Sequence, residues 1–313
     1  MPSLAVIGCG NIGSRLLQSA AQAPVEGLEI HGVEPFESAR ALSAERFAEV
    51  SDRGHVLRMV EGPDALPDTV DLLIVACSAH QRMDALRGAL AHTTPRAVVL
   101  EKTLFTRLSD YDRAAELLDG IPTFVNTTRN IWPGYRDLAG ELGDGPVAVT
   151  VDGTDWNLGS NGIHYLSMAE FVTGATVETV EIENASARDS KRDGYRDLTG
   201  TLRATLSDGS TVTLHSRPQA GDARHPIRVH VVQGDREWDI VEGEQVANGR
   251  PFPMLFASQL GEALAEIVER RTSGLPTLAE STRLHRVYLR ALQPHIHPET
   301  VAGQGDADLC MVT

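Results

Sequence analysis

The sequence predicts an α/β protein with a parallel sheet in its N-terminal half and an α+β domain with a mainly antiparallel sheet in its C-terminal half. In the first half, short apolar runs alternate with helical stretches, which is the pattern of parallel strands joined by crossover helices. In the second half, apolar runs follow one another with turn residues between them, as antiparallel hairpins require. We therefore expect two domains, residues 1–123 and residues 124–313, and the last two helices could pack on either of them.

Six apolar runs and four helical stretches make up the expected N-terminal domain. The first run ends in a glycine-rich loop, and Ile12, Leu16 and Ala20 follow it at helical spacing, so this loop joins a strand to a helix. The expected strands are residues 3–8, 28–34, 56–60, 71–76, 97–100 and 122–125, and the expected helices are residues 12–21, 37–50, 80–92 and 108–119.

The C-terminal domain is expected to hold six strands and two closing helices. Ser207-Asp208-Gly209 and Gln233-Gly234-Asp235 are turn signals between neighbouring apolar runs. Because the domain's own helices are expected to cover only one face of the sheet, we expect a partner on the other face and predict a homo-oligomer. The expected strands are residues 146–153, 177–185, 199–206, 210–216, 226–232 and 236–241, and the expected helices are residues 254–271 and 279–291.

The composition limits the classes of partner. A net charge of −15 repels nucleic acid and anionic membrane surfaces, so we expect small-molecule partners instead. No apolar run approaches the ~20 residues of a membrane-spanning helix. The three cysteines, Cys9, Cys77 and Cys310, show no CxxC spacing. They predict a reducing compartment, which we take to be the cytoplasm, and no metal site.

The loop after the first strand reads Gly8-Cys9-Gly10-Asn11-Ile12-Gly13. This spacing alone is a weak signal, but its place between a strand and a helix is the one that dinucleotide binding requires. The first glycine permits a tight turn, the second lets the backbone approach a pyrophosphate, and the third lets helix and strand pack closely. We therefore predict a Rossmann fold for residues 1–123. The loop residues predicted to bind the dinucleotide are Gly8, Gly10, Asn11, Ile12 and Gly13.

Glu34 closes the second strand, 21 residues after Gly13. A carboxylate at this place hydrogen-bonds the adenosine ribose in dinucleotide-binding folds, and its charge repels a 2′-phosphate. The predicted cofactor is therefore NAD, although Arg40 leaves NADP open. We add Ser78 and Glu101, which follow two later strands, to the predicted cofactor site.

Lys102 is one of only two lysines among 28 basic residues, the other being Lys191. It ends the fifth strand, and the carboxyl ends of such strands face the ligand crevice. A compact ammonium with a tunable pKa can bond a substrate oxygen and stabilise alkoxide character, a role that guanidinium does not replace. We therefore predict Lys102 as a catalytic residue, an exposed lysine after a strand being the alternative.

The glycine loop, Glu34 and Glu101-Lys102-Thr103, followed by an antiparallel half, resemble the Gfo/Idh/MocA family of sugar and polyol dehydrogenases. The resemblance covers most of the chain, and its motifs are specific only in combination. It implies an NAD(P)-dependent oxidoreductase that moves hydride to or from a carbon bearing a hydroxyl group. Thr103 departs from the family's Glu-Lys-Pro signature, which puts the local backbone geometry in question more than the chemistry.

His164 starts a helical pattern in the second half of the chain. The resemblance implies a histidine in this segment beside the nicotinamide, acting with the lysine and usually preceded four residues earlier by aspartate. Ser160 occupies that place here, while Asn161 can share the helical face of His164 and offer hydrogen bonds. An unperturbed pKa near ~6.5 suits histidine to general acid-base catalysis. We predict His164 as catalytic and Asn161 as substrate-binding, a capping or core histidine being the alternative.

Residues 124–135 and the segment ending at His164 also resemble a subset of this family found with surface-polysaccharide and nonulosonate-type sugar pathways. The likeness places Arg129, Trp156 and Asn157 among the substrate-binding residues. Arg129 could then hold a carboxylate or phosphate with two parallel hydrogen bonds. A surface arginine is the alternative at this position.

These features predict a dehydrogenase that moves hydride between NAD(H) and a secondary alcohol or ketone of a sugar, polyol or sugar derivative. In it, His164 acts as general acid and base and Lys102 polarises the reacting oxygen, while the sequence leaves open which of the two takes the proton. Two alternatives stay open. An NAD-assisted lyase or glycosidase with redox cycling uses the same residues, and a non-catalytic dinucleotide-binding regulator uses only the N-terminal ones.

Overall fold

The computed structural model describes residues 1–219, 225–301 and 303–312. The chain divides into two compact units, each with its own sheet. Unit 1 comprises Met1–Phe105, Asp110–Asn126 and Leu255–Leu278, and unit 2 comprises Thr106–Ser109, Thr127–Met254 and Ala279–Thr313. Residues 255–278, which the sequence places in the second domain, therefore pack with the N-terminal part of the chain.

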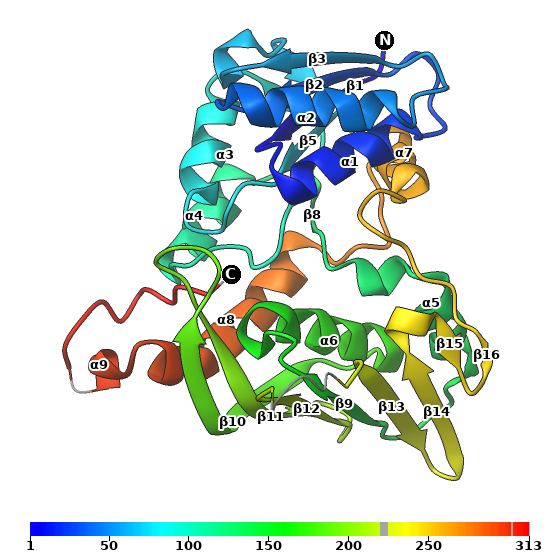
Figure 1. Cartoon of the computed structure of the whole chain (residues 1–313), viewed down its shortest axis with the longest axis vertical. Helices are drawn as coiled ribbons and strands as arrows, with labels where there is room; N and C mark the ends of the chain where they lie inside the picture. The colour runs from blue at the N-terminus through cyan, green and yellow to red at the C-terminus, as the bar shows by residue number, and fades with distance from the viewer. Residues whose placement is uncertain (220–224, 302, 313) are drawn as a thin grey trace. The chain divides into compact units, whose positions relative to one another are not determined.

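Unit 1 is built on a parallel sheet of six strands in the order β3-β2-β1-β5-β7-β8 (Figure 1). Leu4 and Val6 of β1 and Leu73 of β5 are fully buried, as in a parallel sheet covered by helices on both faces. This arrangement confirms the predicted N-terminal sheet. The strands are β1 (Ser3–Ile7), β2 (Glu29–Val33), β3 (Val56–Val60), β5 (Leu72–Val75), β7 (Val98–Leu100) and β8 (Thr123–Val125), with a separate ribbon of β4 (Thr69–Val70) and β6 (Thr94–Pro95).

The helices of unit 1 join these strands and include one from late in the chain. Figure 1 shows α1 and α2 side by side, and α7 also packs on α1. Ser19 of α1 accepts a hydrogen bond from the Leu260 amide at 2.8 Å and donates one to the Ala257 carbonyl at 2.8 Å, which fixes the start of α7. The helices are α1 (Asn11–Ala21), α2 (Glu37–Ala48), α3 (Arg82–Leu90), α4 (Ser109–Leu117) and α7 (Gly261–Arg270), with a short η1 (Pro63–Ala65).

Unit 2 contains an eight-stranded sheet in the order β10-β11-β12-β9-β13-β14-β15-β16. Neighbouring strands are antiparallel except for β9 and β12, which run parallel. The predicted mainly antiparallel sheet is confirmed. The strands are β9 (Ala148–Thr154), β10 (Val177–Asp189), β11 (Arg196–Leu206), β12 (Thr211–Arg217), β13 (Arg228–Gln233), β14 (Arg236–Val241), β15 (Val246–Ala247) and β16 (Arg250–Pro251).

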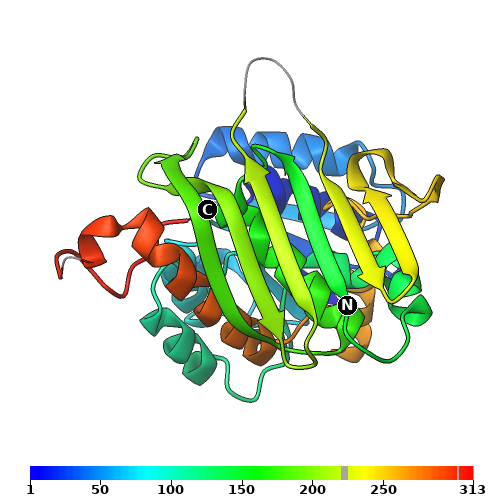
Figure 2. The same ribbon diagram turned by 90° about the horizontal axis from the view of Figure 1, so that it is seen from below.

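One face of this sheet carries the core of unit 2 and the other does not. Val151, Leu202 and Leu214 point to the covered face and are fully buried, whereas Thr150 and His230 on the opposite face are half-buried. Figure 2 views the sheet from this opposite face, with α6 and α8 behind the strands. The helical segments of unit 2 are η2 (Thr128–Ile131), α5 (Pro133–Glu141), α6 (Leu158–Thr173), η3 (Glu242–Glu244), α8 (Leu278–Ile296) and α9 (Pro298–Val301).

The helix that carries His164 begins earlier than the sequence predicts. Its first residue is Leu158, so His164 lies in the second turn of α6 and does not start the helix. The preceding residues include Gly159 and Gly162, and glycine is about 1 kcal/mol less favourable than alanine inside a helix. The apolar pattern in the sequence therefore starts only after the first turn of the helix.

In the described part of the chain, no helix combines the length and the apolar composition needed to cross a bilayer.

Candidate active site

The glycine loop of unit 1 has the geometry expected of a dinucleotide-binding turn. Gly8 directly follows β1 and has a φ of +84°, which only glycine adopts readily. A Cβ atom on Gly13 would lie 2.0 Å from the Gly8 carbonyl oxygen, so the third glycine allows α1 to approach the loop. A Cβ atom on Gly10 would meet no described atom within 4 Å. The side of the loop at Gly10 is therefore open for close approach of a ligand, as an NAD pyrophosphate requires.

Glu34 lies directly after β2 and is held in place by backbone amides. Its carboxylate accepts hydrogen bonds from the Cys9 amide at 2.9 Å and the Phe36 amide at 3.2 Å, and the residue is only 6% exposed. The Arg40 guanidinium donates to the main-chain carbonyls of Glu34 and Pro35 at 2.7 and 2.8 Å. The Glu34 carboxylate thus lies beside the glycine loop, which is the position predicted for it.

The other predicted cofactor residues of the loops also lie in unit 1. Asn11 is exposed and Ile12 is 37% exposed in the first turn of α1. Ser78 follows β5 and is half-buried, and its hydroxyl donates to the Gln81 side chain at 2.8 Å. Because β1 and β5 are parallel neighbours, the segments that follow these two strands lie at the same edge of the sheet.

Glu101 and Lys102 follow β7 at this same edge. The Asn126 side-chain amide, which follows β8, donates to the buried Glu101 carboxylate. Burial raises the pKa of Glu101, although the Asn126 hydrogen bond and the charges of Arg82 and Lys102 oppose this. Lys102 is half-buried, and the peptide bond between Lys102 and Thr103 is cis. The sequence alone gave no reason to pair Asn126 with Glu101, since they lie on different strands.

Arg82 is a second residue that sequence reasoning missed. It begins α3 and is 2% exposed, an unusual burial for arginine. Its guanidinium donates to the Cys77 carbonyl at 2.6 Å, to the Leu104 carbonyl at 2.5 Å and to the Thr103 carbonyl. These bonds tie the segment after Lys102 to the end of β5. No local sequence signal marks such an arginine, because its acceptors are main-chain oxygens.

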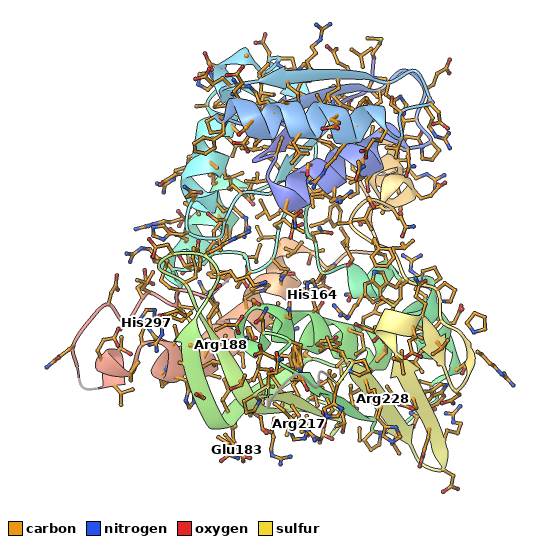
Figure 3. The ribbon with its side chains drawn as sticks, viewed as in Figure 1. His164, Glu183, Arg188, Arg217, Arg228 and His297 are labelled. Atoms are coloured by element: carbon orange, nitrogen blue, oxygen red, sulfur yellow. The ribbon has the colours of Figure 1, made fainter. Side chains whose placement is uncertain are left out.

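The predicted residues of unit 2 gather at the start of α6. His164 is half-buried in the second turn of this helix (Figure 3), and Asn161 donates to the Trp156 carbonyl at 2.8 Å. The Trp156 indole is buried and donates to the His215 carbonyl at 2.7 Å. Asn157 is exposed and accepts a hydrogen bond from Arg188 at 2.7 Å. The structure therefore brings these predicted residues into one region.

Arg129 lies in a nearly buried polar cluster within unit 2. Its guanidinium makes two hydrogen bonds to the Glu242 carboxylate, at 2.7 and 2.6 Å, and its side chain is 11% exposed. The hydroxyls of Tyr135 and Tyr165 donate to the same carboxylate at 2.7 and 3.0 Å. Burial raises the pKa of both tyrosines, so they remain neutral donors. Arg129 is therefore not a surface arginine, and the carboxylate that it binds belongs to the protein.

Arg129→Lys is expected to lower the free energy of unfolding by about 1.5–3 kcal/mol, because an ammonium cannot make the paired bonds to Glu242. Urea denaturation followed by circular dichroism measures the change. Arg136→Lys is the matched control, since Arg136 is exposed on α5. It should change stability by less than about 0.5 kcal/mol. Equal effects of the two substitutions would contradict a stabilising role for the cluster.

Among residues 1–219, 225–301 and 303–312, no group of three or more His, Cys, Asp or Glu residues is placed to hold a metal ion.

The N-terminal part of the chain matches a protein-family model. Residues 3–122 match the model described as an oxidoreductase family with an NAD-binding Rossmann fold. This match agrees with the predicted cofactor. No curated protein matches the sequence.

Solved structures resemble the whole chain at low sequence identity. UDP-N-acetylglucosamine 3-dehydrogenase GnnA from Acidithiobacillus ferrooxidans has a TM-score of 0.68 and 17% identity, covering 93% of this chain and 96% of that one. Scyllo-inositol dehydrogenase from Lactobacillus casei, solved with NAD(H) and scyllo-inositol, has a TM-score of 0.66 and 12% identity, covering 94% and 96%. A myo-inositol dehydrogenase from Corynebacterium glutamicum ATCC 13032 has a TM-score of 0.66 and 16% identity, with the same coverage. At these identities the likeness shows a shared fold.

Proposed function

We propose that the protein transfers hydride between NAD(H) and a secondary alcohol or ketone of a sugar, polyol or sugar derivative, starting from the match of residues 3–122 to the model of an oxidoreductase family with an NAD-binding Rossmann fold. The observation that carries the proposal is the position of Lys102. It follows β7 at the sheet edge where the glycine loop follows β1. The sugar and inositol dehydrogenases of the same fold support the substrate class.

The cofactor site is assigned to residues at this edge of unit 1. The amides at the start of α1 are assigned to the pyrophosphate, and the open side of the loop at Gly10 supports this assignment. The Glu34 carboxylate is assigned to the adenosine ribose. Bound NAD supplies the nicotinamide that accepts or returns the hydride.

Lys102 is assigned the charge chemistry of the reaction, and His164 is assigned the proton chemistry. The Lys102 ammonium hydrogen-bonds the reacting oxygen and stabilises the negative charge that develops there. His164 takes the hydroxyl proton in oxidation and returns it in reduction. We assign substrate binding to Asn161, Trp156 and Asn157.

Arg129 fits a supporting part in this scheme better than direct contact with substrate. Its two hydrogen bonds to Glu242 use the guanidinium N–H groups that would otherwise bind a substrate carboxylate. Tyr165 follows His164 on α6 and shares the same carboxylate. We therefore assign Arg129 a structural role: together with Glu242 and Tyr165 it holds α6 in position.

Glu34→Ala is expected to weaken NAD binding about 10-fold to 100-fold, because a charged hydrogen-bond acceptor contributes roughly 1.5–3 kcal/mol. NADP binding should become stronger, since the charge that repels a 2′-phosphate is gone. Isothermal titration calorimetry with each dinucleotide measures both changes. Glu37→Ala, at an exposed position on α2, is the control. Tighter binding of NADP than NAD by the unaltered protein would contradict the assignment of Glu34.

The reaction is tested by incubating the protein with NAD and a panel containing myo-inositol, scyllo-inositol and UDP-N-acetylglucosamine. Net formation of NADH, followed by absorbance, is the expected result for at least one compound. Product formed without net NADH would point instead to the redox-cycling lyase or glycosidase. Dinucleotide binding without turnover over a broader sugar panel would favour the regulator.

We also propose that the protein forms a homo-oligomer through the uncovered face of the unit 2 sheet. This face carries the cross-strand ion pairs Arg203–Glu183 and Arg228–Asp239, whose alternating charges suit a two-fold contact between identical surfaces. Figure 3 labels Glu183, Arg217 and Arg228 at this sheet. Light scattering after size-exclusion chromatography should give a mass above one chain, whereas a monomer at all concentrations would rule this contact out. A cytoplasmic location remains a prediction.

A further inference from the structure

The first turn of α6 is a poor helix by its own sequence. It reads Leu158-Gly159-Ser160-Asn161-Gly162, in which glycine, serine and asparagine all disfavour helix interiors. Asn157 precedes it in the left-handed region, with φ of 63°, and its side chain makes no capping hydrogen bond. The amides at this helix start therefore need an acceptor from elsewhere in the fold.

Asp197 of β11 supplies that acceptor. One oxygen of its carboxylate accepts the Gly159 amide at 2.8 Å, and the other accepts the Ser160 hydroxyl at 3.0 Å. The side chain is 3% exposed. A Cβ atom on Gly159 would lie 2.9 Å from the nearer carboxylate oxygen, so glycine at this position permits the approach. A negative charge at a helix N-terminus also interacts favourably with the helix dipole.

Tyr288 of α8 holds the same turn from a second element. Its hydroxyl lies 2.5 Å from the Leu158 carbonyl and 3.1 Å from the Gly159 carbonyl, and the residue is fully buried. A Cβ atom on Gly162 would lie 2.6 Å from this hydroxyl oxygen. The two glycines that weaken the helix thus admit the two side chains that hold it.

We propose that Asp197 is a positioning residue for His164, acting through the Ser160 hydroxyl and the Gly159 amide. Ser160 precedes His164 by four residues, so the two lie on one face of α6 and one turn apart. A carboxylate from β11 thereby fixes the first turn of α6, directly before the turn that carries the histidine. This role rests on the proposed function of His164, but the anchoring of the turn can be measured without any substrate.

Asp197→Asn tests the anchoring, because it keeps the shape of the side chain and removes its charge. Hydrogen exchange read by mass spectrometry should speed up about 10-fold to 100-fold in peptides covering residues 158–164, with other helices unchanged. With the fastest compound of the sugar panel and NAD, kcat should fall by a similar factor, whereas the Kd of NAD should not change. Unchanged exchange in α6 would overturn the anchoring, even if no compound of the panel is turned over.

Two further variants separate positioning from general stability. Asp208 accepts the Ser210 amide and hydroxyl at 2.9 Å each, which repeats the Asp197 arrangement in an exposed hairpin. Asp208→Asn should leave exchange in α6 and kcat unaltered. The double variant S160D/D197S moves the carboxylate onto the helix and should restore kcat to within about 10-fold of the original. Faster exchange throughout unit 2 in D197N, without a loss of kcat, would overturn the positioning role.

Discussion

Lys102→Met is expected to lower kcat about 10²-fold to 10³-fold, the usual cost of removing one donor to a developing oxyanion. Methionine has a similar length and no charge, so the half-buried site remains filled. NAD should bind as in the unaltered protein, because the glycine loop and Glu34 are left intact. Steady-state kinetics with the fastest compound of the panel, together with calorimetry for NAD, separates the two effects.

The chain contains its own control for this substitution. Lys191 is the only other lysine and is exposed between β10 and β11. Lys191→Met makes the same chemical change at a site without a proposed role, and kcat should stay within about twofold. Equal loss of kcat in both variants, or none in Lys102→Met, would remove Lys102 from the mechanism.

His164→Asn is expected to lower kcat about 10²-fold to 10⁴-fold, because the contribution of general acid-base catalysis is lost. Asparagine keeps a hydrogen-bonding side chain of moderate size but cannot exchange a proton near neutral pH. The pH profile of kcat/KM should lose the ionisation that belongs to this histidine. Rates measured across the neutral range test both expectations.

His230→Asn is the matched control for His164. His230 lies in β13 on the uncovered face of the unit 2 sheet and is half-buried like His164. Its replacement should leave kcat and the pH profile unaltered. A pH profile that survives in His164→Asn would show that another group exchanges the proton.

The local parts of this protein can be inferred from its sequence. The strand, glycine loop and helix around Gly8 and Gly13 are contiguous, and each glycine answers a steric need set by its neighbours. Glu34 and Lys102 follow from the same reasoning, because parallel strands end at one edge of a sheet. The strand pattern of unit 2 was also visible, since alternating burial has a period of two.

The start of α6 shows where sequence reasoning fails. The pattern predicts a helix from His164, but the helix begins at Leu158 because Asp197 and Tyr288 stabilise a turn of weak helix formers. These side chains lie 38 and 129 residues from Gly159 along the chain. No periodicity within the helix can reveal partners at such separations.

The role of Arg129 also depends on a residue that is distant in the sequence. The sequence shows an arginine near a predicted strand end and a family likeness that assigns it to the substrate. Only the folded chain brings Glu242 to it from 113 residues away. The sequence by itself determined the dinucleotide-binding fold and the candidate residues Glu34, Lys102 and His164, because these depend on local spacing. The tertiary structure decided which charges pair and what holds the histidine's helix, because a buried charge takes its partner from whatever the fold brings near.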